Sequence, residues 1–180
     1  ATAGKADAIL KSAGSLSAMS KIAISDTSAN ISTNISKIEL AGAAGRIMSI
    51  TVSDNKALVL SETQILGSTN TLNAQYTAPV KVEATGVAAA DTAKVQTAVN
   101  SHSSLSLTKE SISDTAANIA AKLDDLEKLA VPSSASGSFT LASIGVSDKG
   151  SMTLSNSTLL KDLDALKIVS GAYTLKVNDL

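Results

Sequence analysis

The sequence has no cysteine and no tryptophan, and its only aromatic residues are one phenylalanine and two tyrosines. Without cysteine the chain can form no disulfide, no thiolate metal site and no cysteine nucleophile. Because aromatic side chains are prominent in pockets for drug-sized ligands, a large aromatic-lined pocket is not expected. The hydrophobic residues, 44% of the chain, are mostly alanine, valine, isoleucine and leucine, so the core must be assembled from many small side chains.

The chain also lacks an excess of charge of either sign. Lysine and arginine total 15 against 16 aspartate and glutamate residues, and no run of like charge occurs. A nucleic acid or an anionic membrane surface is therefore not an expected partner. No segment approaches the roughly 20 apolar residues of a membrane span, so we expect no membrane insertion. Residues 1–10 do not have the pattern of a signal peptide, and we expect any targeting signal to lie outside this sequence.

Internal repetition is the most informative feature that is present. Ser25–Ile31 (SDTSANI) recurs 88 residues later as Ser113–Ile119 (SDTAANI). Ser49–Asp54 (SITVSD) recurs 94 residues later as Ser143–Asp148 (SIGVSD). Repeats at a fixed period are typical of arrays in which each unit packs on its neighbours. We therefore predict a single module, residues 1–180, that consists of two super-repeats.

The super-repeats cover about 1–86 and 87–180, and each divides again into three. Short segments of alternating apolar residues end at similar intervals, five of them on an aspartate. The six endings are Asp26, Asp54, Ala84, Asp114, Asp148 and Asp179. They are separated by 28, 30, 30, 34 and 31 residues, a spacing found in solenoid proteins.

The segments between these endings have helical rather than alternating spacing. Ile31, Ile35 and Ile38 form the apolar stripe of an amphipathic helix. The second copy repeats this stripe as Ile119, Leu123 and Leu126, and helical spacing also relates Leu66, Leu72, Leu160 and Leu166. We predict an α/β fold, a right-handed solenoid of helix-strand coils of about 30 residues with a parallel sheet.

The same pattern predicts which side chains form the core and which sites have turns. The two helical stripes should be buried together with Ile50 and Val52 and with their copies Ile144 and Val146. Turns at 54–56 and 148–150 should each precede a short extra strand. Ser61 and Gln64 have the form of a capping box, and Ser155 retains the cap alone.

The aspartates that end the strands are the candidate site residues. Asp26 and Asp114 are placed to cap the helix that follows each of them. In a stacked array, neighbouring aspartates would form an interrupted column about 4.8 Å apart, and their repulsion would require backbone donors or a cation such as Ca²⁺. We favour capping, and retain a Ca²⁺ site as the alternative, with the ligands Asp26, Asp54, Asp114, Asp148 and Asp179.

Other polar residues have simpler interpretations. Asp124, Asp125 and Glu127 should face solvent, because the inward positions of their helix are apolar. His102 is the only histidine, and serines beside it lack a positioned acid or an oxyanion loop, so we predict that the protein is not an enzyme. The outward strand positions form a surface rich in hydroxyl groups and lysine, which includes Thr51, Ser53, Lys81, Ser147, Thr174 and Lys176.

The segment Ile112–Leu126 (ISDTAANIAAKLDDL) resembles the repeat of very large secreted bacterial proteins, the β-strand-repeat, haemagglutinin-like or type I secreted RTX-type surface proteins. Val87–Ala93 and Gly171–Val177 resemble segments that accompany this repeat. The resemblance implies an extracellular or cell-surface location and a structural, layer-forming or adhesive role. The calcium-binding nonapeptide of RTX proteins is absent, so its calcium binding does not follow from the resemblance.

These observations lead to two functional hypotheses. The first is a structural or adhesive module, an adhesin-like stretch of a longer fibre or layer, whose partner is itself or neighbouring repeats of the same protein. The second is a ligand-binding solenoid, analogous to leucine-rich repeats, that holds a cell-surface protein or glycan on its exposed sheet face. Neither requires a cofactor, apart from the possible Ca²⁺.

Overall fold

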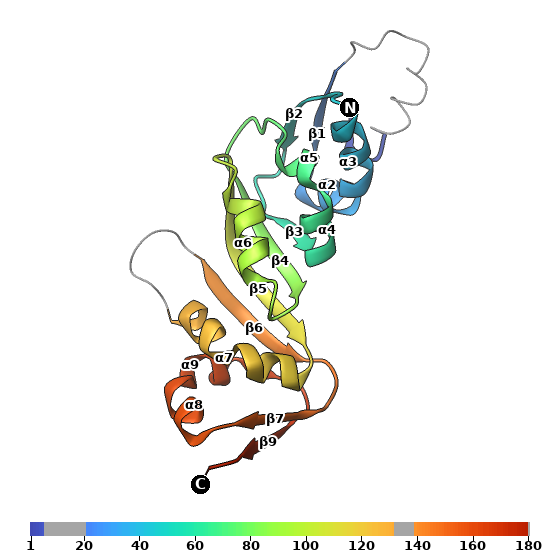
Figure 1. Cartoon of the computed structure of the whole chain (residues 1–180). Helices are drawn as coiled ribbons and strands as arrows, with labels where there is room; N and C mark the ends of the chain where they lie inside the picture. Colours follow the sequence, from blue (N-terminus) through green and yellow to red (C-terminus); the bar gives the residue numbers. More distant parts are fainter. Residues whose placement is uncertain (6–20, 132–138, 180) are drawn as a thin grey trace. The chain divides into compact units, whose positions relative to one another are not determined.

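The computed structural model describes residues 1–5, 21–131 and 139–179, and these residues form a mixed α/β fold (Figure 1). Five strands make one parallel sheet in the order β3 (Leu58–Ser61), β4 (Val80–Val87), β5 (Leu105–Asp114), β6 (Thr140–Val146) and β8 (Val169–Ser170). Two parallel pairs are separate from it: β1 (Ile22–Asp26) with β2 (Ile47–Val52), and β7 (Ser151–Leu154) with β9 (Thr174–Val177).

Helices connect the strands, as the sequence predicts. They are the short 3-10 helix η1 (Ala3–Lys5), α2 (Ser28–Thr33), α3 (Ile35–Ala43), α4 (Glu62–Gly67), α5 (Thr69–Leu72), α6 (Thr92–Asn100), α7 (Ala116–Ala130), α8 (Asn156–Lys161) and α9 (Leu163–Lys167). The helix expected to carry the apolar stripe is continuous in the second super-repeat, as α7. In the first super-repeat it is divided at Asn34 into α2 and α3. The Asn34 amide donates to the Asn30 carbonyl, and asparagine competes in this way with the helical backbone.

The chain divides into two compact units, of which the first contains Ala1–Glu83 and Lys94–Leu107 and the second contains Ala84–Ala93 and Thr108–Leu180. Equivalent strands pair in each unit. In the first unit Ile24 lies opposite Ile50, which also bridges to Tyr76.

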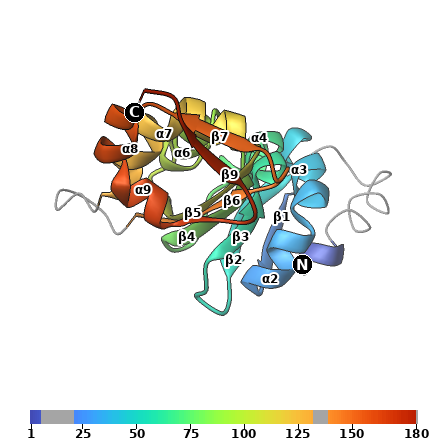
Figure 2. The ribbon, with the colours of Figure 1, turned by 90° about the horizontal axis from the view of Figure 1, so that it is seen from below.

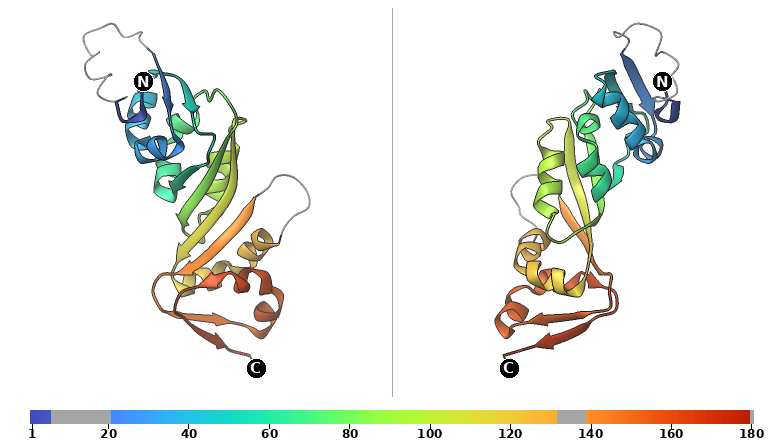
Figure 3. Two further views of the ribbon diagram at one scale, coloured as in Figure 1. Left: turned by 180° about the vertical axis from the view of Figure 1, so that it is seen from behind. Right: turned by 45° about the vertical axis from the view of Figure 1, so that its right-hand side comes forward.

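In the second unit Ile112 lies opposite Ile144, which also pairs with Val169. Helix α7 packs against β6, β7 and α9 (Figure 3). Strand β9 runs beside β7, parallel to it (Figure 2). The pairing of β1 with β2 in the first unit therefore corresponds to the pairing of β5 with β6 in the second.

The predicted core is confirmed at nine of its ten positions. Both helical stripes are buried, as are Ile50, Val52 and Ile144, whereas Val146 is half-buried. Leucines of the short helices α4 and α8 are more exposed. Leu66 and Leu160 are 39% and 64% exposed, because helix α4 turns the neighbouring Ile65 inward and α8 has no buried residue.

The turns and caps read from the sequence are also present. Asn55 and Lys149 have φ angles of 52° and 56°, the left-handed conformation of a tight turn, and β3 and β7 follow them. Ser61 and Gln64 form the reciprocal capping box of α4. Ser155 caps α8 by accepting from the Thr158 N–H.

Candidate functional site

Asp26 connects the end of β1 to two separate helix starts. Its Oδ1 accepts hydrogen bonds from the Thr27 N–H at 2.9 Å and from the Asn30 side chain at 2.7 Å, and its Oδ2 accepts from the Ala3 N–H at 3.0 Å. These donors, Asn30 first, hold the pKa of Asp26 below its ordinary value. The N-cap of α2 is Thr27, whose hydroxyl accepts from the Asn30 N–H, so assigning the N-cap position to Asp26 was wrong.

The same arrangement recurs at Asp114. Its Oδ1 accepts from the Thr115 N–H and the Asn118 side chain, both at 2.8 Å, and its Oδ2 accepts from the Ala89 N–H at 2.9 Å. Thr115 is the N-cap of α7. The repeated sequence Asp-Thr-x-x-Asn is therefore one structural unit. One carboxylate oxygen accepts from the N-cap threonine N–H and from the asparagine side chain, and the other accepts from a second segment.

The remaining strand-end aspartates reach back to the first residue of an earlier helix. Asp54 accepts from the Ser28 N–H and hydroxyl, both at 3.0 Å, and Asp148 accepts from the Ala116 N–H at 3.0 Å. Asp179 accepts from the Asn156 N–H. The first N–H groups of a helix have no partner within it and carry partial positive charge, so a carboxylate stabilises them. For Asp148, the Ala116 N–H is the main cause of a lowered pKa.

The strand register does not align these carboxylates into the expected column. Asp26 lies opposite Val52, two residues before Asp54, and Asp114 lies opposite Val146, two residues before Asp148. Each carboxylate faces N–H donors, which account for its position without a cation. Within the described part of the chain, no three acidic or histidine residues are grouped as a metal site. The Ca²⁺ alternative remains a prediction, without a preformed cluster to support it.

Two glutamates form a second repeated contact that the sequence analysis missed. Glu39 in α3 accepts from the N–H groups of Asn70 and Thr71 in α5, at 3.1 and 2.8 Å. Glu127 in α7, 88 residues later, accepts from Asp164 and Ala165 in α9. The expectation that Glu127 faces only solvent was therefore wrong. The signal was the recurrence of glutamate at the same place in both super-repeats.

Asp162, the residue between α8 and α9, has a different counterpart in the first super-repeat. It is fully buried at the start of α9, and neither of its carboxyl oxygens accepts a hydrogen bond within the described residues. Burial raises the pKa of Asp162 to about 6, and the neighbouring Asp124 carboxylate adds to the rise. Asp124 itself pairs with Lys161 at 3.1 Å. In the first super-repeat the position of Asp162 is occupied by Ser68, which is buried and uncharged.

We predict that Asp162 makes the second unit less stable as pH rises from 5 to 7.5. The folded state holds the Asp162 proton up to about pH 6, whereas the unfolded chain releases it near the ordinary aspartate pKa of 3.8. The stability from this proton is therefore complete below 3.8 and is lost as pH rises through 6. Urea denaturation at both pH values should show the loss in the wild type and not in Asp162→Ser. If Asp162→Ser kept the full pH dependence, another group would be responsible; Asp125→Ser is the control at an exposed carboxylate.

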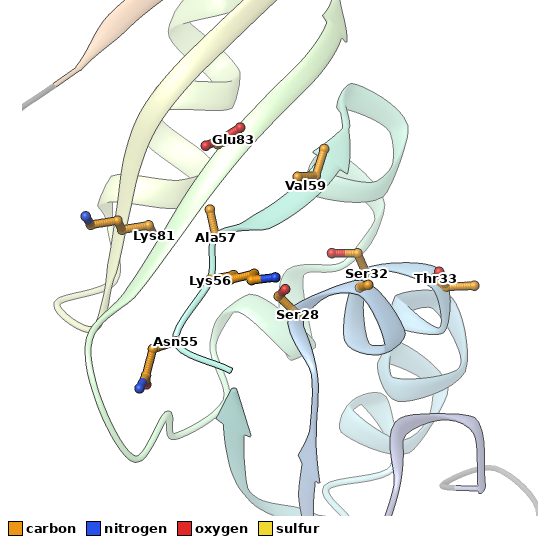
Figure 4. A pocket seen from close by; sticks show the side chains of 10 residues that line it. Ser28, Ser32, Thr33, Asn55, Lys56, Ala57, Val59, Lys81 and Glu83 are labelled. Carbon is orange, nitrogen blue, oxygen red and sulfur yellow. The ribbon is translucent and has the colours of Figure 1, made fainter. Parts of the chain in front are cut away.

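The outward sheet face of the first unit contains a hollow of about 650 Å³ beside β3 and β4 (Figure 4). It is lined by Ser28, Ala29, Ser32, Thr33, Asn55, Lys56, Ala57, Val59, Lys81 and Glu83.

His102 lies in a different hollow, whose lining residues include Ser101 but no acidic residue. No helix in the described ranges is long and apolar enough to cross a membrane.

Comparisons with protein-family models, with curated proteins and with solved structures found no match for this chain. A functional proposal therefore depends on the residues and contacts described above.

Proposed function

We propose that this chain is a structural or adhesive repeat module of a secreted bacterial surface protein, one stretch of a fibre or layer whose partner is itself or neighbouring repeats. The observation that carries the proposal is the repeated strand-end aspartate. Each of the five carboxylates accepts a hydrogen bond from a backbone N–H of a helix start or loop that lies 23 to 32 residues away. Contacts of this span connect each coil to the one before it, and they engage the carboxylates in hydrogen bonds within the fold.

The proposed architecture is the right-handed solenoid of helix-strand coils. Its support is the parallel pairing of β1 with β2 and of β5 with β6, each pair joined by a helical segment, because such crossovers are right-handed in nearly all known cases. The extracellular location and the relationship to type I secreted surface proteins are supported by the sequence resemblance. The proposal includes no catalytic role.

Self-association is the part of the proposal that an isolated chain can test. Strand β9 pairs only with β7 among the described strands, and its Leu175 is 43% exposed. An unpaired strand edge with an exposed apolar side chain favours addition of another strand. Static light scattering over a concentration series should show an apparent mass that rises above 18.1 kDa.

The matched variants are Leu175→Lys, on β9, and Leu40→Lys, at a 65% exposed position of α3. Leu175→Lys should suppress the rise in mass and Leu40→Lys should not. Repeating the series with Ca²⁺ and with a chelator tests whether a cation takes part. A constant monomer mass at every concentration would reject self-association, and equal effects of the two variants would reject β9 as the contact.

A second candidate function is ligand binding on the outward sheet face, with a glycan or a protein as the ligand. The observation that favours it is the hollow beside β4, whose lining combines hydroxyl and charged side chains with the apolar residues Ala29, Ala57 and Val59. Binding that persists in the monomer would distinguish this function from assembly.

A further inference from the structure

The hollow in the first unit has polar groups that the fold does not use. The Ser32 side chain is 8% exposed, and its hydroxyl has no hydrogen-bond partner among the described residues. The hydroxyl points toward the space beside Lys56 and Ala57 (Figure 4). A buried hydroxyl without a partner costs free energy, so this one favours a ligand or a water molecule that supplies an acceptor.

A neighbouring hydroxyl is fixed in position. The Ser28 hydroxyl donates to Asp54 Oδ2 at 3.0 Å, and the Ser28 N–H donates to Oδ1 of the same carboxylate. Because the Ser28 O–H donates its hydrogen bond to Asp54, the lone pairs of the Ser28 oxygen remain to accept a hydrogen bond. The hollow therefore offers one unused hydroxyl at Ser32 and one oriented acceptor at Ser28.

Charged groups of both signs line the same space. The Lys56 ammonium points toward Ser28 and Ser32, and the Glu83 carboxylate lies on the β4 side of the hollow (Figure 4). Neither Lys56 nor Lys81 has an ion-paired or hydrogen-bonded Nζ within the described residues. An anionic group would be held beside Lys56 and Ser32, and neutral hydroxyl groups of the same molecule would lie toward Glu83.

The second super-repeat shows that the fold does not need these hydroxyl groups. At the positions that correspond to Ser28, Ser32 and Thr33 it has Ala116, Ala120 and Ala121. Ala116 still donates its N–H to Asp148, as Ser28 does to Asp54, so alanine preserves the contact between coils. The Ser32 hydroxyl, which has no partner among the described residues, is therefore available for a role other than folding.

We propose that this hollow binds a small hydroxylated carboxylate, and specifically a uronic acid residue of an acidic saccharide. A volume of about 650 Å³ is within the range of small-molecule sites and accommodates one or two sugar rings. The carboxylate pairs with Lys56 and accepts from Ser32, and the ring hydroxyl groups donate to Glu83 and Ser28. No aromatic residue lines the hollow, so no stacking on a sugar ring contributes and the affinity is low. This inference depends on the ligand-binding candidate above and not on self-association.

The test is an NMR titration of the intact chain, at a concentration where it is monomeric, with digalacturonate. Binding should shift amide signals near Ser32, Lys56 and Glu83, with a dissociation constant on the order of 1 mM. Ser32→Ala and Lys56→Gln should each weaken binding by about fivefold or more. Lys176→Gln, at the outward lysine of β9 in the second unit, is the matched control and should leave it unchanged.

Two further ligands decide which chemistry is recognised. The same disaccharide with its carboxylates reduced to alcohols should bind at least about fivefold more weakly, because it cannot pair with Lys56. Inorganic sulfate should also bind more weakly, because it lacks the hydroxyl groups that reach Glu83. Sulfate binding equal to that of digalacturonate would overturn the saccharide assignment, and equal binding of the neutral disaccharide would overturn the role of Lys56.

The variants are expected to fold, because Ser32→Ala introduces the residue of the second super-repeat, and thermal melting verifies this. An absence of shifts at roughly 20-fold above the expected dissociation constant would overturn the site, as would unchanged binding by Ser32→Ala. Since light scattering measures assembly separately, loss of binding and loss of assembly are distinguishable results.

Discussion

Replacing Leu123 by alanine should lower the free energy of unfolding by about 3 kcal/mol, the usual cost of removing a large core side chain. Leu123 is 1% exposed on α7, which packs against β6, β7 and α9. The shortened side chain leaves a cavity that the surrounding strands and helix can close only in part. Chemical denaturation followed by circular dichroism measures the change.

The control is Leu160→Ala, because Leu160 is 64% exposed on α8 and its truncation removes little buried surface. Its effect should stay within about 0.5 kcal/mol. If the two substitutions had equal effects, α7 would not be packed as described. Ile35→Val in the first unit is a milder test of the equivalent position, with an expected cost of about 1 kcal/mol.

Replacing Asp114 by alanine should lower the free energy of unfolding by about 2 kcal/mol, more than a simple helix cap contributes on average. The substitution removes three hydrogen bonds, from Thr115, Asn118 and Ala89, and the last of these joins separate segments of the second unit. Hydrogen exchange measures the change locally. The Ala89 and Thr115 amides should lose protection together, because one carboxylate holds both.

Asp114→Asn should recover only part of this loss. A simple helix cap would tolerate asparagine almost as well as aspartate, since either can cap a helix. The structure shows that both carboxylate oxygens accept hydrogen bonds, whereas an amide has only one acceptor oxygen. Asp125→Ala, at an exposed carboxylate that pairs with lysines of its own helix, should cause no measurable change. Full recovery by asparagine would mean that only one of the two oxygens contributes.

Much of the local structure was predictable because it depends on residues close in sequence. The i, i+4, i+7 spacing of Ile119, Leu123 and Leu126 identified both the helix and its buried face. The capping box of Ser61 and Gln64 was visible because its two partners are three residues apart. Repetition strengthened the helix prediction, since the apolar stripe occurs in both super-repeats, whereas only the serine of the capping box is repeated.

The candidate site was predictable in its residues but not in its contacts. The strand-end aspartates stood out because they recur, yet the sequence suggested that each would cap the next helix or line up in a column. The register of the paired strands prevents such a column. A stagger of two residues places Val52 opposite Asp26, so the aspartates face helix starts and not one another.

The sequence by itself determined the repeat, the alternation of helix and strand, and nine of the ten core positions predicted from it, because periodicity within about ten residues encodes them. Only the tertiary structure decided the partners of Asp54, Glu39 and Asp162. Those partners lie about 25 to 40 residues away in the chain, or are absent, and no local pattern specifies them. The hollow beside β4 likewise depends on the tertiary structure. Its hydroxyl groups, its lysines and Glu83 come from α2, from the turn before β3 and from β4, and only parallel packing of these segments brings them together.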